Sequence, residues 1–344
     1  MEHEVLQKQT AAVPSGLTMR AWVRALPACG KPLPLLSFPA VTLTGVSVYE
    51  LTHDANKQAD GICAVAARCD SAAAVTMMDL SVEAEAFGCR ILTSEHEVPT
   101  VVGALITDPD EAEALAVPEV GAGRTGLYVE AAKIAKSRIH DRPVLAGMIG
   151  PFSLAGRLMD VSEALAACIE DPDMVTAALE KTTAFLIRYA RAYRDAGLDG
   201  IVIAEPLAGL LSPGLETEFS APYMRELVSA VQTDDFAVIC HDCGPNTPYM
   251  TQSFKTVGAD AYHFGDAVDM IDILERMGPD CIVCGNVSPA GQFVGGTPDS
   301  MRDTVLSLRA RAADYPNFVL SSGCDIPPHA SWDNIDAFFA ASKQ

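Results

Sequence analysis

The sequence predicts an α/β protein, and within that class a closed (β/α)8 barrel of the TIM type. Short apolar runs rich in β-branched residues alternate with amphipathic stretches long enough to be helices. Strand followed by helix, repeated, is typical of a parallel sheet. No G-x-G-x-x-G follows the first run, which argues against an open dinucleotide-binding sheet. The eight predicted strands are 33–38 (LPLLSF), 73–78 (AAVTMM), 144–149 (VLAGMI), 200–205 (GIVIAE), 236–241 (FAVICH), 261–264 (AYHF), 281–285 (CIVCG) and 317–322 (NFVLSS).

The helices between these strands have their own signals. Residues 172–196 keep apolar side chains at near-helical spacing, and Asp171 before them is a plausible N-cap. A weak repeat, helix then Gly-x-Asp then strand, occurs at 197–199, 258–260 and 278–280. Glycine at that point fits a left-handed helix C-cap, so we expect three similar helix-to-strand junctions.

The chain is expected to form one domain with two additions. Residues 1–30 are predicted to be an N-terminal helical extension, and residues 31–344 a single barrel. Near 89–107 the pattern favours a β-hairpin inserted after the second strand, because two short β-branched runs are separated by polar residues.

Composition excludes several classes of protein. The formal charge of −21 opposes binding to a phosphate backbone, so no nucleic acid partner is expected. No apolar run approaches the ~20 residues that span a membrane, and the N-terminus lacks the apolar core of a signal peptide, which favours a cytoplasmic protein. The ten cysteines are scattered through apolar segments rather than clustered, so most should be reduced and buried.

Polar side chains stand where the predicted strands end. In a (β/α)8 barrel these carboxyl ends form the mouth that holds the active site, so the residues there are the candidates for function. They are Asp79, Glu205, His241, Cys243, His263, Asp266, Asn286 and Cys324. We expect Asp79, Asp266 and Asn286 to line the mouth where a substrate would bind.

A metal site is predicted from three of them. His241 and Cys243 lie two residues apart on a strand and so face the same side, and Cys324 follows another strand of the barrel. One nitrogen and two sulfurs with an open fourth position is a catalytic zinc set. The alternative is a core histidine beside two inert thiols. Glu205 and His263 are each a possible fourth ligand or a supporting residue behind the ligands, and Glu205 could also be a simple strand-end acid.

The chain resembles the uroporphyrinogen decarboxylase superfamily, and within it the zinc-dependent corrinoid methyltransferases, such as the methylcobalamin:coenzyme M methyltransferases. The segments that carry the resemblance are 39–45 (PAVTLTG), 78–88 (MDLSVEAEAFG), 241–244 (HDCG), 285–289 (GNVSP) and 321–327 (SSGCDIP). The resemblance implies a (β/α)8 barrel and a zinc ion bound through His241, Cys243 and Cys324.

One departure from the decarboxylases bears on function. Their arginine-rich N-terminal motif grips the substrate carboxylates, but no arginine occurs here between Arg24 and Arg68. Asp79 aligns with the aspartate that decarboxylases place at the pyrrole nitrogens. We expect it to orient a ligand or, equally, to cap the helix that follows.

The resemblance therefore implies methyl transfer between a methylated corrinoid and a thiol such as coenzyme M, with zinc making the thiol a thiolate nucleophile. The alternative is the reverse direction, in which a small methylated donor passes its methyl group to the corrinoid. A uroporphyrinogen decarboxylase or a non-catalytic tetrapyrrole-binding protein is less favoured. The sequence lacks a D-x-H-x-x-G corrinoid signature, so the methylcobalamin is expected on a small corrinoid-binding partner protein. The sequence leaves open which thiol or methylated donor is used.

Overall fold

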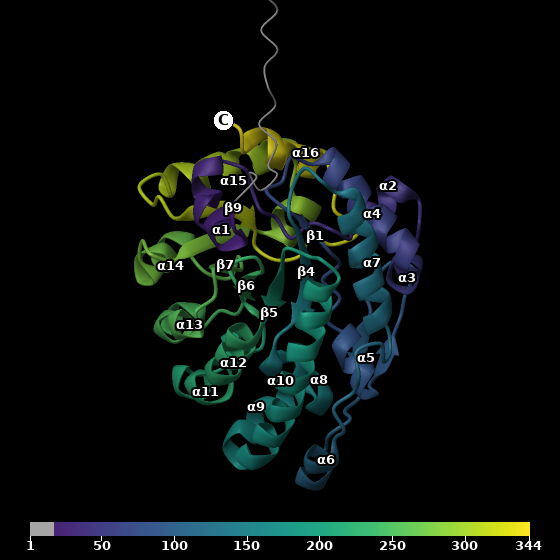
Figure 1. Ribbon diagram of the computed structural model, residues 1–344. Coiled ribbons are helices and arrows are strands. Elements are labelled where there is room, and N and C mark those ends of the chain that lie inside the picture. Colours follow the sequence, from purple (N-terminus) through teal and green to yellow (C-terminus); the bar gives the residue numbers. More distant parts are fainter. Residues whose placement is uncertain (1–16) are drawn as a thin grey trace, which may run out of the picture.

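A computed structural model describes residues 17–344 of the chain. Its centre is a curled sheet of seven parallel strands in the order β1 (Ala74–Val75), β4 (Val144–Ile149), β5 (Gly200–Ala204), β6 (Ala237–Asp242), β7 (Ala261–Phe264), β8 (Ile282–Val287) and β9 (Phe318–Ser322). In Figure 1 these strands lie at the centre, and helices form a ring around them. The predicted α/β barrel is confirmed, with seven of its eight predicted strands.

The eighth position of the barrel differs from the prediction, because residues 33–38 do not form a regular strand. The segment still lies between β9 and the chain before β1: Leu33 N–H donates to the Leu320 carbonyl at 2.9 Å, and the Pro32 carbonyl accepts from Ala72 N–H at 2.8 Å. Pro32 and Pro34 have no N–H to donate. The segment therefore closes the barrel with isolated hydrogen bonds rather than a continuous ladder.

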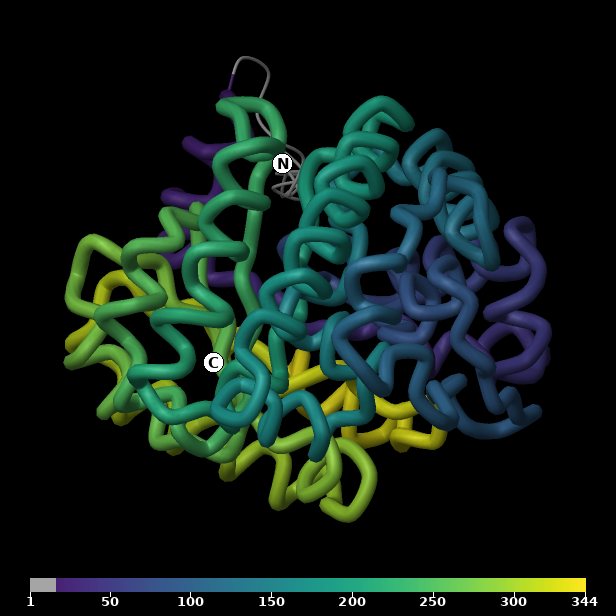
Figure 2. Tube along the Cα trace, turned by 90° about the horizontal axis from the view of Figure 1, so that it is seen from below, coloured from purple at the N-terminus to yellow at the C-terminus, as the bar shows by residue number. Residues whose placement is uncertain are grey.

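The ring of helices surrounds the sheet, as the alternating pattern predicts. The helices are α2 (Ala40–Thr44), α3 (Val48–His53), α4 (Ala55–Arg68), α5 (Val82–Phe87), α6 (Pro109–Ala114), α7 (Thr125–Arg138), α8 (Pro151–Met159), α9 (Val161–Glu170), α10 (Pro172–Asp195), α11 (Pro213–Phe219), α12 (Ala221–Val231), α13 (Thr251–Val257), α14 (Met270–Met277), α15 (Pro298–Arg311) and α16 (Trp332–Ala341). Figure 2, at right angles to Figure 1, shows the blue and the green parts of the chain on opposite sides. The prediction for 172–196 is confirmed, since the Asp171 side chain caps α10 by accepting from Met174 N–H.

Helix α1 (Met19–Cys29) closes the amino-terminal end of the barrel. Its buried residues Met19, Trp22 and Leu26 belong to the same apolar cluster as Val202 and Ile239 on the central strands. This helix accounts for the described half of the predicted extension 1–30, of which residues 1–16 lie outside the described residues. At the other addition, β2 (Arg90–Leu92) and β3 (Thr100–Val102) pair antiparallel in a hairpin.

The Gly-x-Asp repeat connects helices to strands, and two of its three aspartates also bind a neighbouring strand. All three glycines have positive φ, and Gly258 is a left-handed C-cap of α13. The aspartates add a contact that the pattern alone did not reveal. Asp199 accepts from Val144 N–H at 2.7 Å, and Asp260 accepts from Val238 N–H at 3.1 Å. Each aspartate thus binds the first residues of a neighbouring strand.

None of the helices in residues 17–344 is long and apolar enough to cross a membrane.

Candidate metal centre

His241, Cys243 and Cys324 come together at the carboxyl end of the barrel. The ligand atoms of these three side chains all lie within 4.8 Å of one another. His241 lies on β6, Cys243 comes directly after it, and Cys324 follows β9. Within residues 17–344, this is the only group of three or more His, Cys, Asp or Glu side chains that meets this criterion. The trio predicted from the sequence therefore shares one place, and its occupancy by a metal stays a prediction.

The turn after β6 holds Cys243 in position. Because side chains alternate along a strand, Asp242 points away from the side that His241 and Cys243 share. Its Oδ1 accepts from Gly244 N–H at 2.8 Å and from the Thr247 hydroxyl at 2.5 Å. A carboxylate that binds the backbone two residues ahead closes a tight turn. Asp242 therefore shapes the loop that carries the cysteine.

Glycines let the neighbouring loops pack against that turn. A Cβ built on Gly244 would lie 2.4 Å from the Cα of Gly209, in the loop after β5, so neither position has room for a side chain. A Cβ on Gly265, after β7, would lie 2.4 Å from the Cβ of Cys243. Asn286 on β8 donates to the Gly265 and Val268 carbonyls, at 2.9 Å each. Asn286 thus anchors the loop against Cys243, and this bonding occupies its amide nitrogen.

The donor set fits zinc. The neighbouring thiol of Cys324 lowers the pKa of Cys243, while Cys243 and burial raise the pKa of Cys324 to about 12. A metal cation at this point would favour the thiolate form of both sulfurs. His241 Nε2 lies 3.4 Å from the Cys324 sulfur, so the imidazole nitrogen faces the same point. Two soft sulfurs with an imidazole suit zinc rather than magnesium or calcium.

His263 lies behind His241 rather than beside the open position. The Nδ1 atoms of the two rings are 2.8 Å apart, and His263 Nε2 lies 2.7 Å from the Ser321 hydroxyl. Both ring nitrogens of His263 are thus engaged. Burial and the neighbouring His241 keep the pKa of His263 well below its usual value. Of the two roles expected for His263, this geometry suits the supporting residue and leaves no nitrogen for a fourth metal bond.

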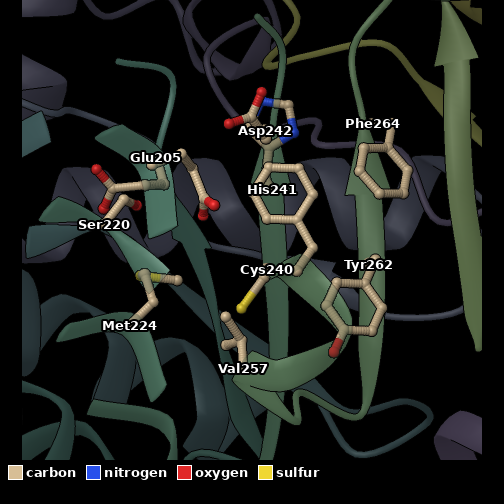
Figure 3. A pocket seen from close by; sticks show the side chains of 11 residues that line it. Glu205, Ser220, Met224, Cys240, His241, Asp242, Val257, Tyr262 and Phe264 are labelled. Atoms are coloured by element: carbon tan, nitrogen blue, oxygen red, sulfur yellow. The ribbon is translucent and has the colours of Figure 1, made fainter. Parts of the chain in front are cut away.

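Glu205 lines a small buried cavity beside the centre. Its Oε1 accepts from Ser153 N–H at 2.5 Å, and its Oε2 has no hydrogen-bond partner among the described residues. Burial raises its pKa to about 8. The cavity, of about 20 Å³, lies between β6, β7 and helices α11 to α13, and Figure 3 shows the side chains around it. Glu205 is not one of the three clustered ligands.

Two further acids surround the same cavity, and one of them has no signal in the sequence. Asp242 is one, and Glu216 on α11 is the other. Glu216 is fully buried, and neither of its carboxylate oxygens has a described partner. Burial raises its pKa to about 7. Only the packing of α11 against the barrel brings Glu216 here, so no strand-end position could have identified it.

Asp79 is held by the protein itself. Its carboxylate accepts from Arg124 at 2.6 Å and from the Tyr128 hydroxyl at 2.8 Å, and its other oxygen accepts from Ser81 N–H and hydroxyl. The N-cap residue of α5 is Ser81, so the expectation that Asp79 caps this helix was wrong. Asp266, predicted to line the mouth, is exposed in the loop after β7.

The chain is similar in sequence and in fold to known proteins. A family model described as uroporphyrinogen decarboxylase (URO-D) matches residues 35–344. The methylcobamide:CoM methyltransferase MtbA of Methanosarcina acetivorans is 28% identical over 269 residues, which are 77% of each protein. The uroporphyrinogen decarboxylase of Dichelobacter nodosus is 28% identical over 222 residues, 62% of this chain and 63% of that protein. A solved structure of a methyltransferase from Methanosarcina mazei superimposes with a TM-score of 0.83 at 25% identity, covering 95% of this chain and 98% of that one.

Proposed function

Because the chain belongs to the uroporphyrinogen decarboxylase family, we propose that it acts within that family as a methyltransferase, moving a methyl group between a methylated corrinoid and a thiol such as coenzyme M. The observation that carries the proposal is the convergence of His241, Cys243 and Cys324. The similarity to a methylcobamide:CoM methyltransferase supports the same activity.

The chain's own residues prepare the site in three ways. His241 presents a ring nitrogen and the two cysteines present sulfurs, and these ligand atoms lie within 4.8 Å of one another. The loops after β5, β6 and β7 pack closely enough to fix the position of Cys243. A zinc ion held by these groups would supply the positive charge that lowers the pKa of an incoming thiol. The barrel would hold that thiol in line with the methyl group, and such positioning contributes several kcal/mol.

The surroundings of Asp79 argue against uroporphyrinogen decarboxylation. A pyrrole nitrogen could bind this carboxylate only by displacing the bonds from Arg124 and Tyr128. The N-terminal arginines that would pair with a substrate rich in carboxylates are missing, since no arginine occurs between Arg24 and Arg68. Incubation with uroporphyrinogen should therefore yield no coproporphyrinogen, and appreciable turnover to that product would contradict the proposal.

The proposal also covers the direction of methyl transfer and the protein that carries the corrinoid. Transfer from a small methylated donor to the corrinoid would use the same residues, so the second direction stays an alternative. The corrinoid is proposed to arrive on a small separate protein, because the chain has no D-x-H-x-x-G signature. The cytoplasmic location expected from the sequence stays a prediction.

The metal is tested by elemental analysis. The purified protein should contain about one zinc per chain, and Cys324→Ser should contain much less. The matched control is Cys281→Ser, since Cys281 is a partly buried cysteine outside the three-residue group. Equal zinc in Cys324→Ser and in the unmodified protein would remove Cys324 from the site.

The reaction is tested with methylcobalamin and coenzyme M under anaerobic conditions. The spectrum of cob(I)alamin should appear with the unmodified protein and with Cys281→Ser, and it should be absent with Cys243→Ala. Chelation should also abolish it. Demethylation of the corrinoid at full rate in metal-free protein would contradict the proposal. Activity only with a methylated donor and cob(I)alamin would select the reverse direction.

A further inference from the structure

We infer that Ser321 and His263 are positioning residues that place the proton of His241 on Nδ1, so that Nε2 is free to bind the metal. This inference rests on the proposed metal centre. It concerns a chain of hydrogen bonds that crosses the barrel from β6 to β7 to β9 and ends on residue 33. The direction of each bond follows from the donors and acceptors present.

The donor and acceptor of each hydrogen bond are fixed starting from Ser321. The Ser321 hydroxyl lies 2.6 Å from the Leu33 carbonyl oxygen, which can only accept. A hydroxyl has one proton, so that proton is donated to Leu33. The Ser321 oxygen therefore acts as the acceptor for His263 Nε2, 2.7 Å away, and His263 Nε2 must carry a hydrogen. The Leu33 carbonyl lies in the closing segment 33–38, which has no regular strand pairing.

The second step concerns the charge of His263. This side chain is fully buried on β7, and its two hydrogen-bond partners are a hydroxyl and another imidazole. A buried imidazolium without a carboxylate beside it would be strongly disfavoured, so His263 is neutral. A neutral imidazole has a single N–H. Since that hydrogen is on Nε2, His263 Nδ1 accepts.

The last step determines which nitrogen of His241 carries the hydrogen. The Nδ1 atoms of His241 and His263 are 2.8 Å apart, and one of them must donate. With His263 Nδ1 as the acceptor, His241 Nδ1 carries the hydrogen, and in the neutral ring of His241 Nε2 then keeps its lone pair. Nε2 is the atom that faces Cys324, at 3.4 Å. The chain of bonds therefore holds the ring in the tautomer and orientation that metal binding requires.

The direct test is NMR of the metal-free protein labelled with 15N-histidine. The chain has seven histidines, so the signals must be assigned. We expect His241 as the Nδ1–H tautomer and His263 as the Nε2–H tautomer, with His263→Asn used for assignment. A neutral His241 ring with its single hydrogen on Nε2 would overturn the inference. This readout is independent of methyl transfer, so a failed activity assay would leave it unaffected.

A pair of variants tests whether the acceptor matters for metal binding. His263→Asn keeps an amide oxygen near the position of Nδ1, whereas His263→Leu has similar bulk and no acceptor. Zinc affinity, measured by chelator competition, should fall about 10- to 100-fold in His263→Leu and only a few-fold in His263→Asn. Equal affinity in His263→Leu and the unmodified protein would contradict the positioning role.

Ser321→Ala tests the hydrogen bond that lies farthest from His241 in this series. It also covers the case in which His263→Leu fails to fold. It removes the acceptor for His263 Nε2–H while leaving both rings in place. We expect the NMR spectrum to show mixed tautomers at His263 and His241, and zinc affinity to fall less than in His263→Leu. Unchanged tautomers at both rings would show that Ser321 does not set the direction of the chain.

Discussion

Two buried acidic regions of this barrel are built in different ways. The first, here called the arginine cluster, consists of Asp79, Ser81, Glu85, Arg124 and Tyr128. The second, here called the carboxylate cavity, contains Glu205, Glu216 and Asp242. In the arginine cluster, one guanidinium binds Asp79, Glu85 and Ser81 at 2.6 to 2.8 Å. In the carboxylate cavity, all three acids have at least one oxygen without a described partner, and none forms an ion pair within the described residues.

The difference separates two reasons for burying a carboxylate. Burial beside an arginine keeps the acid ionised, because the opposite charge compensates for lost hydration. Burial without a cation favours the protonated form, and the pKa values of Glu205 and Glu216 rise to about 8 and about 7. Asp79 and Glu205 both stand at strand ends in the sequence, yet they belong to these opposite cases. A strand-end acid is therefore not a ligand or a catalytic group by position alone.

The largest expected effect comes from breaking the arginine cluster. Arg124→Met should lower the free energy of unfolding by about 3–5 kcal/mol, because it leaves the buried charge of Asp79 uncompensated. Urea unfolding measures this. The matched control is Arg188→Met, which removes an exposed ion pair with Glu119 and should cost under ~1 kcal/mol. A loss in Arg124→Met no greater than in the control would remove the distinction between the two regions.

The second prediction concerns pH and the carboxylate cavity. Burial raises the pKa of Glu216 from its ordinary value of 4.5 to about 7, so the folded state binds its proton more tightly than the unfolded state. Stability from this group is therefore lost as pH rises between those two values. From pH 5 to pH 8, the free energy of unfolding should fall by roughly 2–3 kcal/mol more in the unmodified protein than in Glu216→Gln.

Glu218→Gln is the control for this prediction, because Glu218 is exposed on the same helix. It should leave the pH dependence as it is in the unmodified protein. If Glu216→Gln gives a parallel curve instead, Glu216 is ionised or solvated in the folded state, and the contrast with the arginine cluster fails at this residue.

The smallest expected loss of stability comes from removing the Tyr128 hydroxyl from the arginine cluster. Tyr128→Phe removes one hydrogen bond to Asp79 and leaves the bond from Arg124 in place. The loss should be about 1.5–3 kcal/mol, typical of a hydrogen bond to a charged group and below that of Arg124→Met. Thermal or urea unfolding at neutral pH measures it. A loss as large as that of Arg124→Met would mean that Tyr128, not the guanidinium, dominates the binding of Asp79.

Much of the fold followed from local patterns, and one feature was misjudged despite a local signal. Seven strands and the cap of α10 by Asp171 were predicted correctly, because alternating apolar runs and capping residues act over a few residues. The segment 33–38 was predicted as a strand from its leucines. Pro34 within it and Pro32 just before it lack the N–H groups of a ladder, and that information was present in the sequence.

The candidate site also combines features that local patterns predict with features that depend on distant contacts. The face shared by His241 and Cys243 follows from the two-residue period of a strand. The roles of Arg124, Glu216 and Ser321 depend on contacts between residues far apart in the chain. Arg124 binds Asp79 across 45 positions, and Ser321 binds Leu33 across 288. No pattern within a window of ten or twenty residues carries such contacts.

The sequence by itself determined the order of strands and helices, the acidic charge, and the residue types at the barrel mouth, since these depend on composition and short-range periodicity. Tertiary structure alone decided which of those polar side chains are free. It bound Asp79 to Arg124, enclosed Glu205 without a cation, and placed His263 behind His241. The physical reason is that the free energy of a buried polar group depends on its partners and its distance from water. Those are known only once distant segments are packed together.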